Sequence, residues 1–190
     1  MAAQVLALLD GDIAAHMTDG LADVYAEAFA APPHREPPEA ADRFRESLAR
    51  HATLPGFRAA AAWAAGADLV GFGYGHTSRP GQWWHERVGD ALAPREAARW
   101  LAEPFVVVDL AVRPRCQRQG IGGRLHDLLL EHLPHAAAVL SARQDDAGAL
   151  RLYHGRGWQE IGRDLAFVPG GDPYVILARR LAGHPGTFLE

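Results

Sequence analysis

Several residue types are scarce or missing in this chain of 190 residues. It contains a single cysteine, Cys116, and neither lysine nor asparagine, so all of its 19 basic residues are arginines. A single cysteine excludes an internal disulfide, and a cytoplasmic location is therefore the default expectation. The missing lysine excludes both a catalytic Schiff base and a Walker-type lysine that holds phosphate.

Long apolar runs and an excess of positive charge are absent as well. No run of about 18 apolar residues occurs, so no membrane span is expected. The formal net charge of −4 lacks the basic field of a nucleic-acid-binding protein, and no nucleic acid is expected as a partner. Near the start, Asp10, Gly11 and Asp12 interrupt an apolar stretch that has no basic segment before it, which favours a first strand over a signal peptide.

Strand and helix patterns alternate along the chain, without repeats, low-complexity tracts or clear linkers. Apolar stretches predict strands at 4–9, 56–66, 68–77, 105–112, 136–142, 158–162 and 174–181. Amphipathic patterns predict helices at 19–30, 38–51, 120–133 and 147–155, and an aromatic, charged insert at 79–104 is expected to be partly helical. We expect one domain, 1–190, of the α/β (α+β) class, with a mixed, mostly antiparallel sheet flanked by helices.

The stretch QRQGIGGRLHDLLL, residues 117–130, places three glycines directly before a leucine-rich helix. Gly120, Gly122 and Gly123 lack Cβ atoms, so a ligand can come close to the backbone there. A helix N-terminus offers unpaired N–H groups and a partial positive charge, and phosphate is its usual guest. Four arginines surround the glycines with no acid between them: Arg113, Arg115, Arg118 and Arg124. This segment predicts a site for a phosphate-bearing ligand, the alternative being glycines that serve helix packing alone.

Two common phosphate motifs fit this segment poorly. A Walker loop needs lysine, and a dinucleotide-binding fingerprint needs a third glycine where Leu125 stands. The hexapeptide 117–122 instead resembles motif A, Q/R-x-x-G-x-G/A, of the GNAT superfamily of N-acetyltransferases. The strand 105–112 and the helix after the loop resemble the same family in order and spacing.

A second segment strengthens the resemblance, which covers residues 104–182 specifically. SARQDDAGALRLYHGRGWQEIGR carries Asp146, Ala149, the pair Leu152-Tyr153 and the pair Gly157-Trp158 at the spacing of the family's other coenzyme A segment. Asp146 stands where the family usually has asparagine. The resemblance implies a GNAT-like fold with a bulged central strand that splays from its neighbour.

The resemblance also implies the cosubstrate and the residues around it. Acetyl-CoA would serve as cosubstrate without a metal, and the acetyl group would pass directly to a primary amine, in the first place that of a small molecule. Backbone of the strand would pair with the pantetheine arm, and the loop would hold the pyrophosphate. The residues expected to bind acetyl-CoA are Leu110, Ala111, Val112, Gln117, Arg118, Gln119, Gly120, Ile121, Gly122, Gly123, Asp146 and Tyr153.

Two side chains are candidates for proton transfer. A coenzyme A thiol has a pKa of ~8.5 and a tyrosine one of ~10, so a phenol beside the sulfur can donate a proton to it. The GNAT pattern implies this role for Tyr153, with core packing as the alternative. Asp109 lies in the most apolar strand, where burying a carboxylate that has neither a partner nor a function is energetically unfavourable. It is therefore the candidate general base. Its rivals are Glu86, His85 and His76, and water alone could also drain the proton.

The acceptor side is expected between the N-terminal helices and the insert 79–104. Trp83, Trp84 and Trp100 are candidates for its walls, the alternatives being a core cap or the seam of a homodimer. Glu86 and Asp90 are candidates for attracting a cationic amine. Two other functions stay open: a protein or peptide N-acetyltransferase, and a non-catalytic sensor module that binds coenzyme A.

Other features are expected to be unremarkable in chemical terms. Cys116 could act as a nucleophile that carries the acyl group, but direct transfer to the amine is expected instead. No metal site is expected, because Pro134 separates the last two members of the set His126, His132 and His135. The alternation of glycines at 71, 73 and 75 marks a strand that could leave one sheet face open to a ligand.

Overall fold

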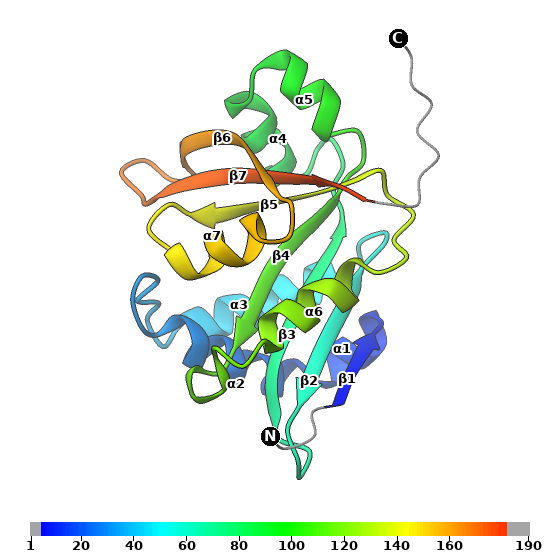
Figure 1. The fold of residues 1–190 in the computed structure, drawn as a ribbon, viewed down its shortest axis with the longest axis vertical. Helices are drawn as coiled ribbons and strands as arrows, with labels where there is room; N and C mark the ends of the chain where they lie inside the picture. Colours follow the sequence, from blue (N-terminus) through cyan, green and yellow to red (C-terminus); the bar gives the residue numbers. More distant parts are fainter. Residues whose placement is uncertain (1–4, 182–190) are drawn as a thin grey trace. The chain divides into compact units, whose positions relative to one another are not determined.

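The computed structural model describes residues 5–181 and contains a seven-stranded sheet (Figure 1). The strands are β1 (Val5–Leu9), β2 (Arg58–Trp63), β3 (Leu69–Thr77), β4 (Phe105–Val112), β5 (Ala137–Arg143), β6 (Gln159–Ala166) and β7 (Pro173–Arg180). The helices are α1 (Gly11–His16), α2 (Thr18–Phe29), α3 (Ala40–His51), α4 (Trp83–Ala91), α5 (Pro94–Trp100), α6 (Ile121–Leu130) and α7 (Ala147–His154), with a 3-10 turn at Pro114–Cys116. Gln4, part of the first predicted strand, lies outside the described residues. No helix within 5–181 is long and apolar enough to cross a membrane.

The sheet has the strand order β1-β2-β3-β4-β5-β7-β6 and a mostly antiparallel register. Antiparallel pairing joins β1 to β2, β2 to β3, β5 to β7 and β6 to β7. The strands β4 and β5 run parallel and are in register only at Phe105 with Ala138 and Val106 with Val139. The predicted mixed, mostly antiparallel sheet flanked by helices is confirmed, and the short parallel register agrees with a central strand that splays.

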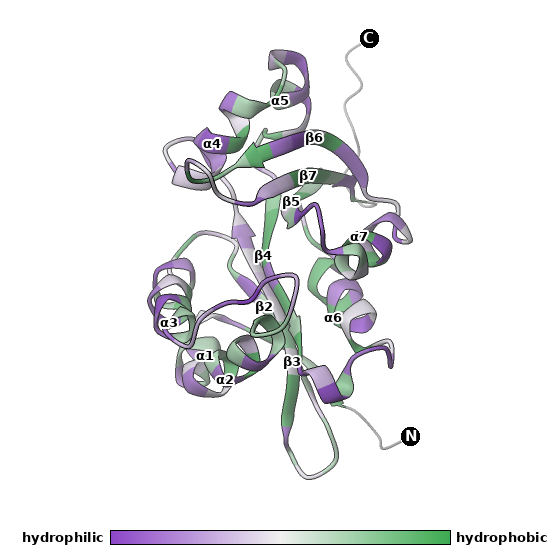
Figure 2. Cartoon of the chain, turned by 90° about the vertical axis from the view of Figure 1, so that its left-hand side faces the viewer, coloured by the Kyte–Doolittle hydropathy of each residue, from purple (hydrophilic) through white to green (hydrophobic). Residues whose placement is uncertain are grey.

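Two compact units make up the described chain. The first comprises residues 5–76 and 107–131, and the second comprises residues 77–106 and 132–181. In the first unit, α1, α2 and α3 cover one face of the strands and α6 covers the other (Figures 1 and 2). In the second unit, α4 and α5 lie on one side of the strands β5, β7 and β6, and α7 lies on the other. A single domain over 1–190 stays a prediction.

The core of the first unit is built from apolar side chains at helical and strand spacing. Phe44 and Leu48 of α3 lie one turn apart and are 4% and 1% exposed, while β3 is buried along its whole length. Along the same stretch, α3 shows purple and green in alternation in Figure 2, which is the pattern of a helix with one solvated face. The ring of Phe44 lies 4.7 Å from that of Tyr25 and 5.4 Å from that of Phe72.

Helix boundaries depart from the sequence-based expectation at two places. The sequence pattern missed α1, whose N-terminus is capped by Asp10 Oδ1 accepting from the Ile13 N–H at 2.9 Å. The helix α6 ends at Leu130 rather than at residue 133, because the backbone of Glu131 is extended and His132 has φ of 55°, outside the right-handed helical region. Its predicted inner face is confirmed except at Leu128, which is only half-buried.

The glycine alternation of β3 makes room for neighbouring side chains. A Cβ atom on Gly71 would lie 3.0 Å from Cδ1 of Leu125, and one on Gly73 would lie 2.8 Å from Cδ1 of Leu110. The idea that these glycines leave a sheet face open to a ligand is therefore wrong. They let a helix and a strand pack closely against β3.

Candidate active site

The N-terminus of α6 is open in the way that the sequence predicts. Gly120 occupies the position before the helix with φ of 78°, a left-handed conformation that favours glycine, and no side chain caps this end. Residues 117–120 are exposed, and a Cβ on Gly120 would meet nothing within 4 Å. The first N–H groups of a helix have no partner within it, so this end can donate several hydrogen bonds to a phosphate.

The arginines around this loop are only partly available. The Arg113 guanidinium donates to the carbonyl of Leu69 at 2.7 Å and pairs with Glu27. Arg115 pairs with Asp68 at 2.6 Å. Two members of the predicted arginine cluster therefore serve ion pairs within the first unit, while Arg115, Arg118 and Arg124 are exposed.

Asp109 lies halfway along β4 and faces a cavity of about 220 Å³ in the first unit. Burial raises the pKa of its carboxyl from 3.8 to about 6, and a hydrogen bond from the Tyr74 hydroxyl opposes this rise. No ion pair to Asp109 occurs within residues 5–181. A carboxylate with a pKa near 6 is ionised at neutral pH and still basic enough to accept a proton. The walls of the cavity are Tyr25, Glu36, Ala40, Arg43, Phe44, Ser47, His51, Tyr74, Val108 and Asp109.

A chain of polar groups leads away from Asp109. The Tyr74 hydroxyl lies 3.2 Å from Nδ1 of His51, and the His51 ring lies 5.0 Å from the ring of His76. Burial lowers the pKa of His51 to about 4, with His76 and Arg50 lowering it further. Burial and the charge of Asp109 raise the pKa of Tyr74 well above its usual value. His51 is therefore neutral and Tyr74 protonated at neutral pH. The rival base His76 contacts the ring of His51, which in turn contacts the ring of Tyr74, whose hydroxyl donates to Asp109.

Sequence reasoning missed the residues that surround Asp109. Tyr74 stands within the glycine alternation GFGYGH, and His51 is the last residue of α3, 58 positions before Asp109 in the sequence. Glu36 and Arg43 contribute the remaining charges of the cavity. No local motif links these four residues, because only the packing of α3 and the segment 31–38 against β3 and β4 brings them together.

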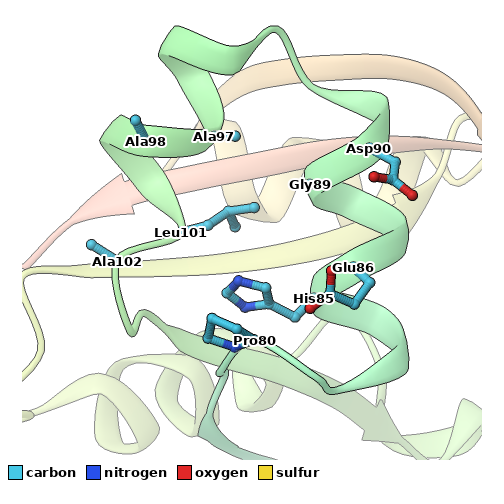
Figure 3. A pocket seen from close by; sticks show the side chains of 9 residues that line it. All are labelled: Pro80, His85, Glu86, Gly89, Asp90, Ala97, Ala98, Leu101 and Ala102. Carbon is cyan, nitrogen blue, oxygen red and sulfur yellow. The ribbon is translucent and has the colours of Figure 1, made fainter.

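A second cavity, of about 360 Å³, lies in the second unit between α4 and α5 (Figure 3). His85, Glu86 and Asp90 line it together with small apolar residues. His85 is 8% exposed, and its Nδ1 lies 3.0 Å from the Ser78 hydroxyl. Burial lowers the pKa of His85, and the charge of Glu86 partly offsets this. Glu86 accepts a 2.6 Å hydrogen bond from the Gly81 N–H, so its carboxylate stabilises the start of α4.

The tryptophans of the insert do not line either cavity. Trp100 is 1% exposed, donates from Nε1 to Glu96 and lies under the guanidinium of Arg180. Trp84 donates from Nε1 to the Ser141 hydroxyl. Trp83 is 61% exposed and lies beside Phe167. The expectation that they wall an acceptor pocket is not supported by these contacts, and the core-cap alternative describes Trp100 best.

Asp146 has a structural role that the sequence did not predict. Its Oδ1 accepts hydrogen bonds from the N–H groups of Gly148 at 3.0 Å and Ala149 at 2.9 Å, and so caps α7. This carboxylate does the work that an asparagine oxygen could do at the same position. Its contact with a cosubstrate stays a prediction.

Tyr153 lies on the buried face of α7 in the second unit. It is 7% exposed, and its ring meets that of Trp158 edge-on at 5.6 Å. The backbone carbonyl of Tyr153 also accepts from the Trp158 N–H at 3.2 Å. The packing role that the sequence allowed is therefore present, and the proton-donor role stays a prediction. No group of three His, Cys, Asp or Glu side chains within residues 5–181 is arranged to hold a metal ion.

Comparison with known proteins agrees with the fold and shows the family. The acetyltransferase (GNAT) family matches residues 21–158, and the chain belongs to this family. It is 35% identical over 125 residues to a GCN5-like protein acetyltransferase of Mycobacterium tuberculosis, covering 60% of each chain. It is 36% identical over 83 residues to the N-alpha-acetyltransferase RimI of the same organism, covering 43% of this chain and 51% of the relative. The chain thus spans between about half and three fifths of these curated relatives.

A solved structure shares the fold over the full length. The Salmonella typhimurium protein yncA, solved with its cofactor acetyl-CoA, superposes with a TM-score of 0.66 at 14% identity and covers 100% of both chains. At this identity the likeness concerns the fold.

Proposed function

We propose that this protein is an acetyl-CoA-dependent N-acetyltransferase that acetylates the primary amine of a small molecule. The observation that carries the proposal is the position of Asp109 on β4. Its carboxyl has a pKa of about 6 and faces a cavity. The next residues, Leu110, Ala111 and Val112, are those whose backbone is expected to pair with the pantetheine arm. The general base and the backbone that would hold the thioester are therefore neighbours on one strand.

The residues around α6 fit acetyl-CoA as cosubstrate. The uncapped helix end, the left-handed Gly120 and the exposed residues 117–120 provide backbone donors without obstructing side chains. We assign the pyrophosphate to the backbone N–H groups of residues 117–123. Acetyl-CoA supplies an acyl group on a thiol that leaves at neutral pH.

The proposed reaction balances with two side chains of this protein. A C–N bond forms between the acceptor amine and the acetyl carbon, and the C–S bond breaks. Asp109 takes the proton that the amine loses, and Tyr153 donates a proton to the departing sulfur. A backbone N–H near Leu110 would stabilise the carbonyl oxygen as it becomes anionic. The products are an acetamide and coenzyme A.

A second candidate function is transfer to a protein or peptide. The names of the two Mycobacterium tuberculosis relatives, a protein acetyltransferase and an N-alpha-acetyltransferase, favour it. The cavity of about 220 Å³ beside Asp109 favours a compact acceptor or the terminal residue of a chain. A non-catalytic module that binds coenzyme A is the least favoured, because it gives Asp109 no task.

The experiment that tests the proposal is amine-dependent release of thiol from acetyl-CoA. We expect thiol and an acetamide product in equal amounts with phenethylamine, and tighter-than-millimolar binding of coenzyme A by calorimetry. The variant Gly122→Trp should stay folded and lose this affinity, because its side chain blocks the helix N-terminus. Tyr153→Phe should bind coenzyme A normally and lower kcat by about 100-fold or more. Binding without amine-dependent thiol release for small or peptide amines would instead identify a binding module.

A further inference from the structure

The charges around the cavity of Asp109 are unequal. Glu36 and Asp109 contribute two carboxylates, and Arg43 contributes one guanidinium. The histidine that lines the cavity, His51, has a pKa of about 4 and is neutral at pH 7. At neutral pH the side chains that line the cavity therefore carry one net negative charge.

The guanidinium in this cavity is already paired. Arg43 Nη2 lies 3.3 Å from Glu36 Oε2, and the two side chains are 61% and 35% exposed. The Glu36 backbone N–H donates to the Phe29 carbonyl at 2.9 Å, which fixes the segment 31–38 beside the end of α2. An anionic acceptor would have to displace Glu36 from Arg43 while approaching a second carboxylate, that of Asp109.

The remaining walls suit the body of a compact amine. Tyr25 and Phe44 stack with ring centroids 4.7 Å apart and an interplanar angle of 25°. Tyr74 meets Phe44 edge-on at 6.2 Å. Aromatic faces attract ammonium groups and pack against apolar groups, and neither interaction favours a carboxylate.

We propose that the Glu36–Arg43 pair makes this cavity select acceptors by charge: amines whose neighbouring group is uncharged are acetylated, and free amino acids are rejected. This inference rests on the proposed function. It assigns Glu36 and Arg43 as residues that determine specificity and not as groups that take part in proton transfer. Neutral substitutions of the two residues should have effects of opposite sign on acceptor choice, because replacing Glu36 removes a negative charge and replacing Arg43 removes a positive one.

The test uses three acceptors that share one ring and one amine. Phenethylamine carries hydrogen, phenylalaninamide a carboxamide and phenylalanine a carboxylate beside the amine. The quantity measured is the ratio of kcat/KM for the amide to that for the acid, and comparing this ratio between variants cancels the different basicities of the amines. We expect phenethylamine and the amide to be acetylated well by the wild type, and the acid poorly.

The two members of the ion pair should move this ratio in opposite directions. Glu36→Gln should lower it about three- to fivefold and Arg43→Gln should raise it about three- to fivefold, the small size reflecting the exposure of the pair. Glu39→Gln, an identical change at an exposed position outside the cavity, should leave it unchanged. A loss of local structure would shift both variants of the pair in the same direction.

Three results would overturn the inference. The ratio could stay constant in both variants of the pair, shift in one direction for both, or already favour phenylalanine in the wild type. No transfer to any of the three amines or to a peptide would overturn the proposed function itself, and the inference with it. Transfer to all three amines with equal efficiency would leave the acetyltransferase standing and remove only the selection by charge.

Discussion

The two cavities contain similar residue types in different surroundings. Each has a carboxylate and a histidine: Asp109 with His51 in the first unit, and Glu86 with His85 in the second. Asp109 lies in a strand of apolar residues, and burial raises its pKa to about 6. Glu86 lies in the first turn of α4, is exposed, and accepts from the Gly81 N–H.

The difference shows how local structure decides what an acid can do. An acid at a helix N-terminus finds backbone N–H donors, and Glu86 is held in this way by the Gly81 N–H. Asp109, within a strand of apolar residues, is largely removed from water, and this burial favours its protonated form. The second environment provides a proton acceptor near neutral pH, which supports Asp109 over Glu86 as the general base.

The largest expected effect separates the two acids directly. Asp109→Asn should lower kcat by about 10²- to 10⁴-fold, because the amide cannot accept the proton of the amine. Glu86→Gln keeps shape in the other cavity and should leave kcat within about twofold of wild type, since the proposed reaction makes no use of its charge. Steady-state kinetics, normalised to folded protein, measures both. The reverse pattern would transfer the role of base to the second cavity.

The pH dependence should carry the signature of Asp109. In a plot of log kcat/KM against pH, the slope for wild type should be steeper by one unit below pH about 6 than above it. The reason is that a protonated Asp109 carboxyl cannot act as a base. The Asp109→Asn variant should lack this additional slope, whereas a contribution from His85 would persist in it. The ionisable groups that face this region from α2, the segment 31–38, α3 and β3 are Tyr25, His34, Glu36, Arg43, Arg50, His51, Tyr74 and His76.

Stability should change in the direction opposite to activity. Because the folded state holds the proton of Asp109 up to pH about 6 and the unfolded state releases it near 3.8, folding is weakened as the pH rises through this window. Asp109→Asn avoids this loss. Relative to wild type, the variant should gain roughly 1–3 kcal/mol of unfolding free energy between pH 4 and pH 7. Urea unfolding of both proteins at the two pH values tests this, and an unchanged difference in stability between variant and wild type from pH 4 to pH 7 would contradict it.

The smallest effect concerns Tyr74. Its hydroxyl donates to Asp109 and lowers the pKa of that carboxyl, so Tyr74→Phe should move the break in the pH profile to higher pH. Well above the break, the variant should keep most of its kcat, because the carboxylate is still present. A purely structural role for Tyr74 predicts reduced stability with the break unmoved. The pH profile of kcat/KM at equal folded concentration distinguishes the two roles.

Local sequence patterns predicted most of the secondary structure and the loop before α6. Apolar periodicity located β1 to β7 within a few residues, and the glycines with the following leucines located the open helix end at Gly120. Such signals succeed because strands, amphipathic helices and glycine turns depend on neighbours in the sequence. The short α1 escaped notice because six residues give too little periodicity, although Asp10 was a usable capping signal.

Asp109 shows which of its properties the sequence determines and which depend on the tertiary structure. An acid among valines already indicates a special role, and the sequence determined that much by itself, together with the family and the glycine-rich loop before α6. The helices α2 and α3 and the segment 31–38 decided the rest, because they bring Tyr74, His51, Glu36 and Arg43 to the same cavity. Contacts between residues so distant in sequence leave no periodic pattern. The proton affinity of Asp109 and the charge of its cavity therefore exist only in the folded chain, where burial removes water from the carboxyl and fixed neighbours replace it.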